Sequence, residues 1–338
     1  MMDHALQRLV DSVLPKPAYA GVRKGWHHFL RLQHEGFFTA SQRRRLWPKI
    51  LATPPMQTDP VTDGCELCIH LMCYLGDYLA AIWALKSFYH QSGKTYPLAI
   101  HIQGTSTGRM ENQLRQHFPN ARLIFQDEAD RVVEGYLRRR KLHRLLAMRR
   151  AIPTMQKLTD FLTMTTARRI VILDSDVLFF NNPAELAELT GGQGQEFRVQ
   201  RDFMDAYTIA LERGKSDFGI NLQPAVNVGI VRLTPDAIDL EKCDEYLAHP
   251  EFAQLEGHTE QTLWALEASR RDLVSYLPDS YYISLGGPAD CARLKARHYA
   301  GLSRGMFTHE GIPYLIRSGF LENLQRTSTS RKPAGAIQ

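Results

Sequence analysis

Short apolar runs alternate with segments of helical length along residues 65–125. The runs "CELCIHLMCY" (65–74), "YPLAIHIQG" (96–104) and "ARLIFQ" (121–126) have the length of strands. They are separated by a helical pattern that ends at Gly93 and by another over 108–118. Strands that alternate with helices of this length predict an α/β fold with a mostly parallel central sheet and helices on both faces.

Two carboxylates follow the next apolar run, "RRIVIL" (168–173), which comes after a long stretch predicted as helical from 131 through Pro153 to 165. Its uninterrupted apolar residues indicate a central strand that is covered on both faces. Asp174 and Asp176 stand at its carboxyl end, where open parallel sheets bind ligands. Two positions apart on extended chain, their side chains leave the same face.

Burying two such carboxylates without compensation costs several kcal/mol, which a divalent cation would remove. D-x-D also occurs in ordinary turns. The position directly after a buried strand favours a metal site. Further along, Asn182 is expected to cap a helix whose first residue is Pro183.

Three regions are expected along the chain. Residues 1–60 form a helical, basic N-terminal extension that closes in the proline-rich "LATPPMQTDP", residues 61–305 form the main domain, and residues 306–338 form a C-terminal extension. The later elements of the main domain are a strand over 224–233, helices over 236–248 and 258–269, and a segment over 295–301. The tail from 327 to 338 is expected to be disordered.

The composition indicates a soluble globular protein, with 44% hydrophobic and 23% charged residues in 338. The net charge of +5 is mild, but basic residues cluster in 43–45 and 137–150. Such clusters are solvated helix faces, or they bind anionic ligands, acidic glycans or a membrane surface. No nucleic-acid-binding motif accompanies them. Without a signal peptide or a long apolar run, a cytoplasmic location is expected, with peripheral contact to the inner membrane surface as an alternative.

The five cysteines are an odd count in a long chain, which argues against a disulfide framework. Cys65 and Cys68 form C-x-x-C, but no second pair or histidine pair follows at zinc spacing. The pattern indicates strand thiols rather than a metal or redox site.

Four motifs resemble those of a known family. "KLTDFLTMTTARRIVILDSDVLFFNNPAEL" (157–186) is similar to the D-x-D region of nucleotide-sugar glycosyltransferases with the GT-A fold. "NVGIVRL" (227–233), "HTEQTLWAL" (258–266) and "HYAGLSR" (298–304) resemble further motifs, the last being the H-x-x-G-x-x-K stretch of the family 8 retaining transferases. Over residues 65–305, the resemblance implies a Rossmann-like nucleotide-binding half and an acceptor half.

The resemblance assigns a metal site and a donor site. It implies that Asp174, Asp176 and His298 bind Mn²⁺ or Mg²⁺ against the diphosphate of the donor, and the added imidazole favours Mn²⁺. Arg304 replaces the family's lysine and gains a two-pronged contact with phosphate oxygens. The donor-binding positions implied are Asp174, Ser175, Asp176, Gly229, Gly301, Arg304 and Lys157. Arg149 and Lys157 reach the donor phosphates or lie on a solvated helix face.

The reacting centre is implied at three further positions. Gln261 corresponds to the residue that faces the anomeric carbon, Glu260 replaces the usual aspartate, and Asn227, with Gly229, borders the donor sugar or the acceptor. If the enzyme inverted configuration it would need a carboxylate base, for which Glu260, Asp202 and Asp205 are candidates.

The predicted function is metal-dependent transfer of a sugar from a nucleotide-diphosphate sugar, with UDP-sugar as the default, to an acceptor hydroxyl with retention. The acceptor is a glycan, a lipid-linked molecule or a small molecule. A sugar-phosphate nucleotidyltransferase and an inactive binding module of the same fold are the alternatives. The first of these normally has a glycine-rich loop after its first strand, which "CYLGDY" (73–78) lacks.

Overall fold

The computed structural model describes residues 38–189, 194–253, 258–285 and 287–330. The chain divides into two units, residues 1–46 and 47–338. Of the predicted N-terminal extension, residues 38–46 are helical, η1 (Trp47–Ala52) is a 3-10 helix, and residues 53–60 are irregular, while residues 1–37 lie outside the described residues. Everything that follows belongs to the second unit.

A seven-stranded sheet forms the centre of this unit, in the order β3-β2-β1-β4-β7-β6-β8. Four of its six neighbouring pairs are parallel, and β7 runs antiparallel to both β4 and β6. The predicted fold class, a mostly parallel sheet with helices on both faces, is therefore confirmed. The strands are β1 (Cys68–Cys73), β2 (Leu98–Ile102), β3 (Arg122–Phe125), β4 (Ile170–Leu173), β6 (Phe197–Arg201), β7 (Val226–Leu233) and β8 (Val274–Tyr276).

Successive strands of the chain are placed on one side of β1 up to β3 and on its other side from β4. From β1 the chain adds β2 and then β3 on one side, whereas β4 returns to the other side of β1. Such a switch point opens a crevice at the carboxyl ends of the two strands, where α/β proteins bind ligands. Asp174 and Asp176 follow β4 directly and therefore lie at this crevice.

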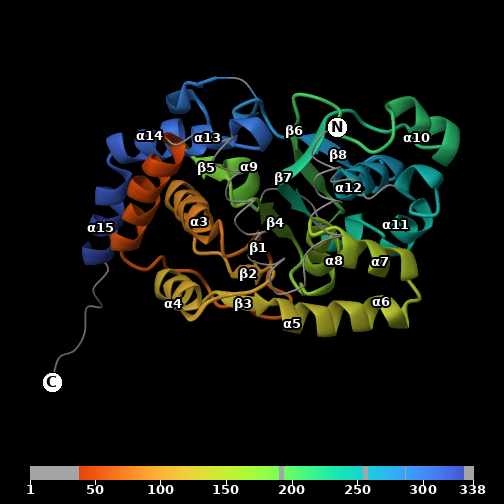
Figure 1. The fold of residues 1–338 in the computed structure, drawn as a ribbon, viewed down its shortest axis with the longest axis horizontal. Helices are drawn as coiled ribbons and strands as arrows, with labels where there is room; N and C mark the ends of the chain where they lie inside the picture. The colour runs from red at the N-terminus through yellow and green to blue at the C-terminus, as the bar shows by residue number, and fades with distance from the viewer. Residues whose placement is uncertain (1–37, 190–193, 254–257, 286, 331–338) are drawn as a thin grey trace, which may run out of the picture. The chain divides into compact units, whose positions relative to one another are not determined.

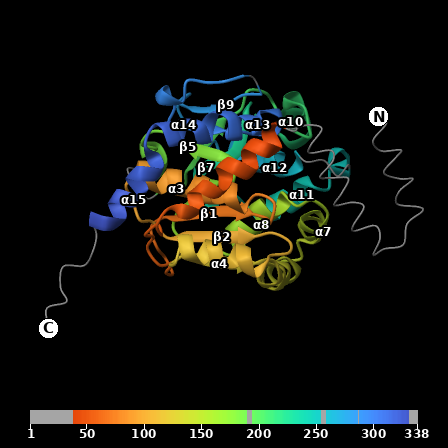
Figure 2. The same ribbon diagram turned by 60° about the vertical axis from the view of Figure 1, so that its left-hand side comes forward.

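Helices cover both faces of the sheet (Figures 1 and 2). On one side α3 (Tyr78–Ser92) packs against β1 and ends at Gly93, whose φ of 63° suits glycine. On the other, α7 (His143–Ala151), α8 (Met155–Thr163), α11 (Leu240–Tyr246) and α12 (Thr259–Arg270) share one apolar core with the sheet. All four residues of β4 are buried, as a strand covered on both faces requires.

The predicted continuous helix over 131–165 is wrong. The chain forms α5 (Gln126–Ala129), a π-helical turn η2 (Asp130–Glu134) and α6 (Gly135–Arg139) before α7 and α8 begin. Lys141 adopts a φ of 61° between α6 and α7, which no α-helix contains. Pro153 separates α7 from α8 because it disfavours helical geometry at Ile152, whose φ is −118° and ψ 111°.

A second, three-stranded sheet pairs β10, from the late part of the chain, with β5, which follows β4. Its strands are ordered β5 (Val177–Phe179), β10 (Ala296–His298) and β9 (Tyr281–Ile283). Because β5 starts immediately after Asp176 and pairs with β10, His298 lies opposite Val177. This register brings a residue from the late part of the chain to the D-x-D segment.

The remaining helices surround these sheets. The predicted cap at Asn182 is wrong: α9 (Ala184–Ala187) starts after Pro183 and has no side-chain cap. The helix expected over 236–248 becomes η3 (Pro235–Ala237) followed by α11, which Asp239 caps through the amides of Glu241 and Lys242. The other helices are α4 (Gly108–His117), α10 (Leu211–Phe218), η4 (Pro250–Ala253), η5 (Cys291–Arg293), η6 (Gly301–Ser303), α13 (Arg304–Met306), η7 (Phe307–Gly311), α14 (Ile312–Arg317) and α15 (Phe320–Ser330).

Helix α15 includes residues 327–330, the first four of the tail predicted to be disordered, and residues 331–338 lie outside the described residues. Among the described helices, none combines the length and the apolar character needed to cross a membrane.

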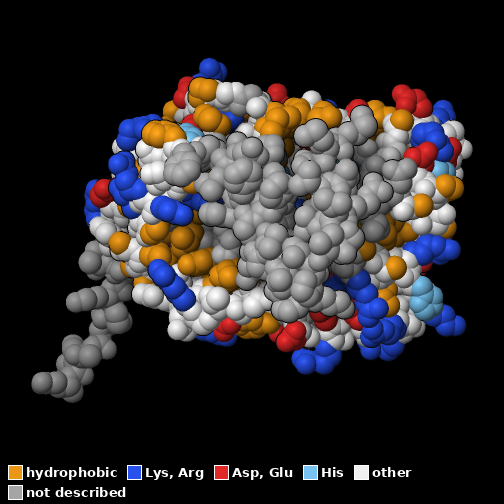
Figure 3. Space-filling view, in the orientation of Figure 1, with side chains coloured by type: hydrophobic (Ala, Val, Ile, Leu, Met, Phe, Trp, Pro, Cys, Tyr) orange, Lys and Arg blue, Asp and Glu red, His pale blue; other side chains and the backbone are white. Residues whose placement is uncertain are grey.

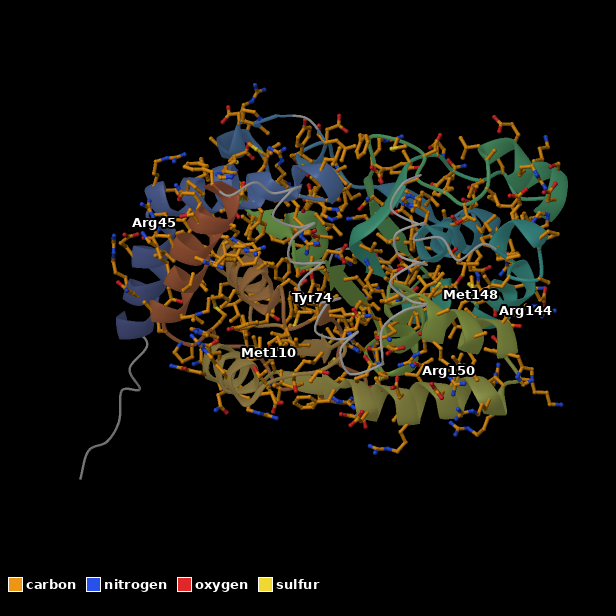
Figure 4. The ribbon with its side chains drawn as sticks, in the orientation of Figure 1. Arg45, Tyr74, Met110, Arg144, Met148 and Arg150 are labelled. Atoms are coloured by element: carbon orange, nitrogen blue, oxygen red, sulfur yellow. The ribbon has the colours of Figure 1, made fainter. Side chains whose placement is uncertain are left out.

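Basic side chains gather over α6 and α7, with acidic ones among them (Figure 3). Most of these arginines pair with carboxylates: Arg138 and Arg150 with Glu134, Arg140 with Glu241 and Arg144 with Asp244. Arg144 and Arg150 both project from α7 (Figure 4). This surface is therefore a mixed one, which agrees best with a solvated helix face.

Candidate metal and ligand site

Three side chains predicted as metal ligands lie together. Asp174, Asp176 and His298 each offer one ligand atom, and these atoms lie within 4.8 Å of one another. The Nε2 atom of His298 is 3.3 Å from Asp176 Oδ1 and 3.6 Å from Asp174 Oδ2. Ligands about 2.1 Å from one octahedral ion are roughly 3 Å apart, so only a small adjustment would bring all three onto one cation.

The orientation of His298 leaves Nε2 available as a ligand. Its Nδ1 is 3.1 Å from Asn227 Oδ1, and this oxygen also accepts the amide hydrogen of Gly229 at 3.0 Å. The amide group of Asn227 is fixed in this direction because its Nδ2 donates to Asp202 Oδ2 at 2.7 Å. An oxygen facing Nδ1 places a hydrogen there, so that in the neutral imidazole, the form that binds a metal ion, the lone pair of Nε2 points toward the two carboxylates.

The imidazole of His298 lies directly over Gly229. A Cβ atom at position 229 would be 2.2 Å from Cε1 and 2.5 Å from Nδ1 of His298. Only glycine leaves room for the ring here. Gly229 was predicted to border the donor sugar or the acceptor, and its contact in the structure is with the histidine.

The two carboxylate oxygens of Asp174 have different partners. Lys157 Nζ, on α8, donates to Asp174 Oδ1 at 2.8 Å, which leaves Oδ2 facing His298. Burial alone would lower the pKa of Lys157, but the charges of Asp174 and Glu260 raise it above its usual value. Lys157 is therefore a permanent cation at this site, as the prediction of a donor-phosphate contact requires.

Asp176 is held ionised in the same cluster. Burial opposes its charge, but the hydrogen bond and the charge of His298, with Arg304 nearby, lower its pKa to about 2. Burial likewise opposes the charge of His298, whereas Asp176 raises the pKa of the imidazole. Arg304 Nε is 3.8 Å from Asp176 Oδ2, and the guanidinium is about one-third exposed. It can therefore turn toward an anion bound beside the aspartates.

Asp77 belongs to this cluster and was not predicted from the sequence. It follows β1 and accepts a hydrogen bond of 2.6 Å from Ser175 Oγ, so that the middle residue of D-x-D turns away from His298. Its Oδ2 is 3.7 Å from Arg304 Nη2, and burial raises its pKa to about 6. Tyr74, the residue directly after β1, is labelled in Figure 4, and its amide donates to Asp77 Oδ1 at 2.8 Å.

The residues predicted at the reacting centre lie at the start of α12 and in β7. Glu260 is buried, accepts from Trp264 Nε1 at 2.6 Å, and has its pKa raised by burial to about 7. Gln261 Nε2 donates to Ala206 O at 3.0 Å. Trp264 and Leu263 are core residues.

The predicted alternative bases both have structural partners. Asp202 accepts from Asn227 and from the amide of Phe203 at 2.8 Å, and Asp205 accepts from the amide of Ala225 at 2.7 Å. Ala225 has a φ of 54°, so Asp205 stabilises an unusual turn before β7.

Gly301 is among the predicted donor-binding positions. Its φ is 54°, and a Cβ there would be 3.5 Å from Leu285. Gly301 begins η6, three residues after His298 and three before Arg304, so glycine at this position permits the turn that separates these two side chains.

Arg149 does not reach this site. It is buried and donates from Nε and Nη2 to the two oxygens of Asp160, at 2.7 and 2.8 Å, and from Nη1 to Asp130 at 2.7 Å. Both interpretations from the sequence, a phosphate contact and a solvated helix position, are wrong for Arg149. It completes a buried ion pair between α7, α8 and η2.

Similar solved structures include several glycosyltransferases. Mouse xyloside xylosyltransferase 1 in its apo form is 16% identical, with a TM-score of 0.43 over 69% of this chain and 97% of that chain. The galactosyltransferase LgtC in complex with donor and acceptor sugar analogues is 14% identical, with a TM-score of 0.45 over 80% of this chain and 98% of that one. The mannosyltransferase Ktr4p from S. cerevisiae is 12% identical, with a TM-score of 0.42 over 72% and 79%. The sequence matches no family model and no curated protein. At such distances, the function of this chain has to be inferred from its own site.

The donor set suits a divalent cation. Two carboxylates and one imidazole provide two hard oxygen ligands and one borderline nitrogen, a combination that fits Mn²⁺ or Mg²⁺ and, with the imidazole, favours Mn²⁺. The ligand atoms converge, the tautomer of His298 is fixed, and Gly229 provides the space. Lys157 and Arg304 lie beside the cluster and add positive charge to the site.

Proposed function

We propose that this protein transfers a sugar from a nucleoside diphosphate sugar to an acceptor hydroxyl. The observation that carries the proposal is the convergence of Asp174, Asp176 and His298 at the switch point of the sheet. Lys157 and Arg304 flank this cluster and supply positive charge for a diphosphate. The sequence motifs resemble those of GT-A enzymes at the same positions, and the proposed fold and activity are of that kind.

In this proposal Asp174, Asp176 and His298 hold the metal ion, with Mn²⁺ as our first choice and Mg²⁺ as the second. When bound, the ion neutralises charge on the departing diphosphate. Arg304 adds a second cation there, and its two-pronged group contacts phosphate oxygens. Lys157 orients Asp174 through the hydrogen bond from its Nζ to Oδ1. Ser175 and Asp77 fix the backbone that carries both aspartates through their 2.6 Å hydrogen bond.

The donor sugar is proposed to lie between the aspartates and the start of α12. Gln261 would face the anomeric carbon there, and Asn227 would act by orienting His298. Burial raises the pKa of Glu260 to about 7, so this carboxyl group is about half ionised at neutral pH, and its Oε1 accepts from Trp264 Nε1. Asp202 and Asp205 already accept backbone or amide hydrogens. All three candidate bases are thus engaged within the chain, which favours retention of configuration over inversion, since inversion needs a carboxylate that is free to take the acceptor proton.

UDP is the proposed nucleotide, and the acceptor is a glycan, a lipid-linked molecule or a small molecule. A cytoplasmic location and contact with the inner membrane surface stay predictions. The paired arginines of α6 and α7 reduce the net charge available for membrane contact.

A panel of nucleotide sugars with Mn²⁺ tests the proposal. Release of free nucleoside diphosphate, lost in EDTA and restored by Mn²⁺, is the expected result. Pyrophosphate consumption with formation of nucleoside triphosphate would instead indicate the nucleotidyltransferase, and no turnover with any donor together with no nucleotide binding would indicate the binding module. An anomeric NMR assay of the product distinguishes retention from inversion.

A further inference from the structure

A second group of reactive side chains lies at the amino-terminal ends of the sheet strands, whereas the candidate metal ligands lie at the carboxyl ends. Cys68 is the first residue of β1 and is buried, and Cys65 is half-buried in the segment before it. Both thiols are free. They line a cavity of about 270 Å³, together with His70, Ala99, Arg122 and Thr166.

The strand register explains why a cavity forms there. His70 on β1 pairs with Ala99 on β2, and Ala99 pairs with Arg122 on β3. Paired residues on neighbouring strands point to the same face, so a methyl group stands between an imidazole and a guanidinium. The small middle side chain leaves space that the segment 164–167, between α8 and β4, covers only in part.

One buried polar atom of this cavity lacks a partner. His70 is 1% exposed; its Nδ1 is 3.1 Å from His101 Nε2, whereas its own Nε2 has no hydrogen-bond partner among the described residues. Burial lowers the pKa of His70 to about 3, so its ring is neutral. An unsatisfied buried group of this kind costs about 1–3 kcal/mol. The cavity is therefore suited to a ligand that brings a polar atom to His70.

The two thiols differ in the way that exchange chemistry requires. Interaction with the Cys68 thiol lowers the pKa of Cys65 to about 7, although burial and the charge of Asp63 oppose this; the Sγ of Cys68 also lies 3.7 Å from Ile69 O. The same interaction and burial raise the pKa of Cys68 above its usual value, with the charge of Arg122 opposing. A half-buried thiolate beside a buried, protonated thiol is the arrangement of an attacking and a resolving cysteine.

Hydrogen bonds hold the backbone around the two cysteines. The amide of Arg168 donates to Cys65 O at 2.9 Å, and the amide of Cys68 donates to Arg169 O at 3.1 Å. Both ends of the C-x-x-C segment are thus fixed to the chain that enters β4. This fixation favours reaction between the two side chains over reaction with a second molecule.

We propose that Cys65, Cys68 and the cavity beside them form a thiol–disulfide exchange site for a low-molecular-weight disulfide. The Cys65 thiolate attacks one sulfur of the disulfide, forms a mixed disulfide and releases one thiolate. Cys68 then gives up its proton to solvent and attacks Cys65, which forms the Cys65–Cys68 disulfide and releases the second thiol. The protein loses two electrons and the small disulfide gains them. This activity is independent of the proposed sugar transfer.

The test uses the full, reduced chain, oxidised glutathione as the probe, and peptide mass spectrometry after alkylation of the remaining thiols. We expect a Cys65–Cys68 disulfide in the native protein, while the buried Cys73 and Cys243 stay reduced and serve as internal controls. Cys68→Ala should accumulate the mixed disulfide at Cys65. Cys65→Ala should react at neither position. Oxidation of Cys65 no faster than that of Cys243 would overturn the proposal without bearing on the transferase.

Two further measurements separate an exchange site from a merely accessible thiol. The rate of Cys65 alkylation by iodoacetamide should be half-maximal near pH 7, and the midpoint should rise in Cys68→Ala because the interaction with the Cys68 thiol is lost. An unchanged midpoint in that variant would contradict the assigned pairing. Ala99→Val narrows the cavity and should slow the reaction with oxidised glutathione more than the reaction with iodoacetamide. Equal slowing of both, or of neither, would remove the cavity from the proposal.

Discussion

Two buried clusters of charge differ in how completely their charges are matched. Around Arg149, both oxygens of Asp160 and one of Asp130 receive hydrogen bonds of 2.7 to 2.8 Å from one guanidinium. At the end of β4, Asp174 and Asp176 face the same imidazole nitrogen, and the nearest guanidinium atom is 3.8 Å from Asp176.

The first cluster is closed, because each charge has a directed partner within the chain. In the second, carboxylate oxygens converge on a common point, which is what a cation requires. The spacing of opposite charges along the sequence does not distinguish the closed cluster from the open one. The positions of the charged atoms in the fold do distinguish them. The clearest test is to remove one charged residue from each cluster.

The largest expected effect is on metal binding. Asp176→Ala should lower Mn²⁺ affinity by more than about a hundredfold, because even outer contacts of a metal site contribute roughly ten- to a hundredfold. Isothermal titration calorimetry with Mn²⁺ measures it, and circular dichroism should show an intact fold. Asp130→Ala removes a carboxylate from the closed cluster and is the matched control. Equal affinity in Asp176→Ala and the unaltered protein would refute the metal site.

The largest expected effect on stability belongs to the closed cluster. Arg149→Met leaves Asp160 buried without its cation and should lower the free energy of unfolding by about 3–5 kcal/mol. Urea unfolding measures it, while Mn²⁺ affinity should stay unchanged. Arg150→Met is the control, since this neighbouring arginine is exposed and should leave stability nearly unaltered. A similar loss in both variants would show that helix α7, rather than the ion pair, is responsible.

A smaller effect should follow from crowding the histidine of the open cluster. In Gly229→Ala the new methyl group overlaps the ring of His298, which must move away from the two aspartates. Mn²⁺ affinity should fall by roughly tenfold or more. Gly108→Ala, where a Cβ meets nothing within 4 Å, should leave it unchanged. Retained affinity in Gly229→Ala would mean that His298 is not a ligand.

The smallest expected effect is a change in the pH dependence of stability. The pKa of Glu260 is raised from 4.5 to about 7 in the folded state. Between these pH values the folded chain holds more protons than the unfolded chain, so the free energy of unfolding falls as pH rises from about 4.5 to 7. Glu260→Gln removes this loss and should be more stable than the unaltered protein at pH 8, with little difference near pH 4.5.

Glu267 in the same helix provides the contrasting variant. It is also buried, but Arg270 and Arg271 donate to its Oε1 at 2.6 and 3.0 Å. Glu267→Gln should therefore lower stability at pH 8. Destabilisation by both substitutions, measured by urea unfolding at the two pH values, would show that Glu260 is as well compensated as Glu267.

The sequence predicted the sheet and the grouping of Asp174, Asp176 and His298, the histidine through the motif resemblance and the other features through local patterns. Alternating strands and helices fix the α/β class, and Asp174 and Asp176 follow an apolar strand. Asp77 also follows a strand but stands alone, and its role depends on β1 lying beside β4. With the strand order known, a carboxylate at the end of the adjacent strand becomes a candidate.

Other failures have similar causes. Arg149 and Lys157 look alike in the sequence, and only the packing of α8 sends one to Asp160 and the other to Asp174. The break between α6 and α7 occurs at Lys141, whose positive φ no propensity predicts. C-x-x-C indicated strand thiols, and Cys68 is the first residue of β1. The cavity beside it could not be predicted from the pattern because it depends on Ala99 of the neighbouring strand.

The three metal ligands come from segments that meet only through the second sheet. The amide of Asp174 bonds to Gly229 O, and the amide of Tyr299 bonds to Asp176 O, each at 2.9 Å. An ion bound by both aspartates and His298 would cross-link the D-x-D segment after β4 to β10. At a hundred times its dissociation constant it would add about 2.7 kcal/mol to the folded state. When a chelator removes the ion, the helices after β10 should be the first part of the chain to become susceptible to proteolysis.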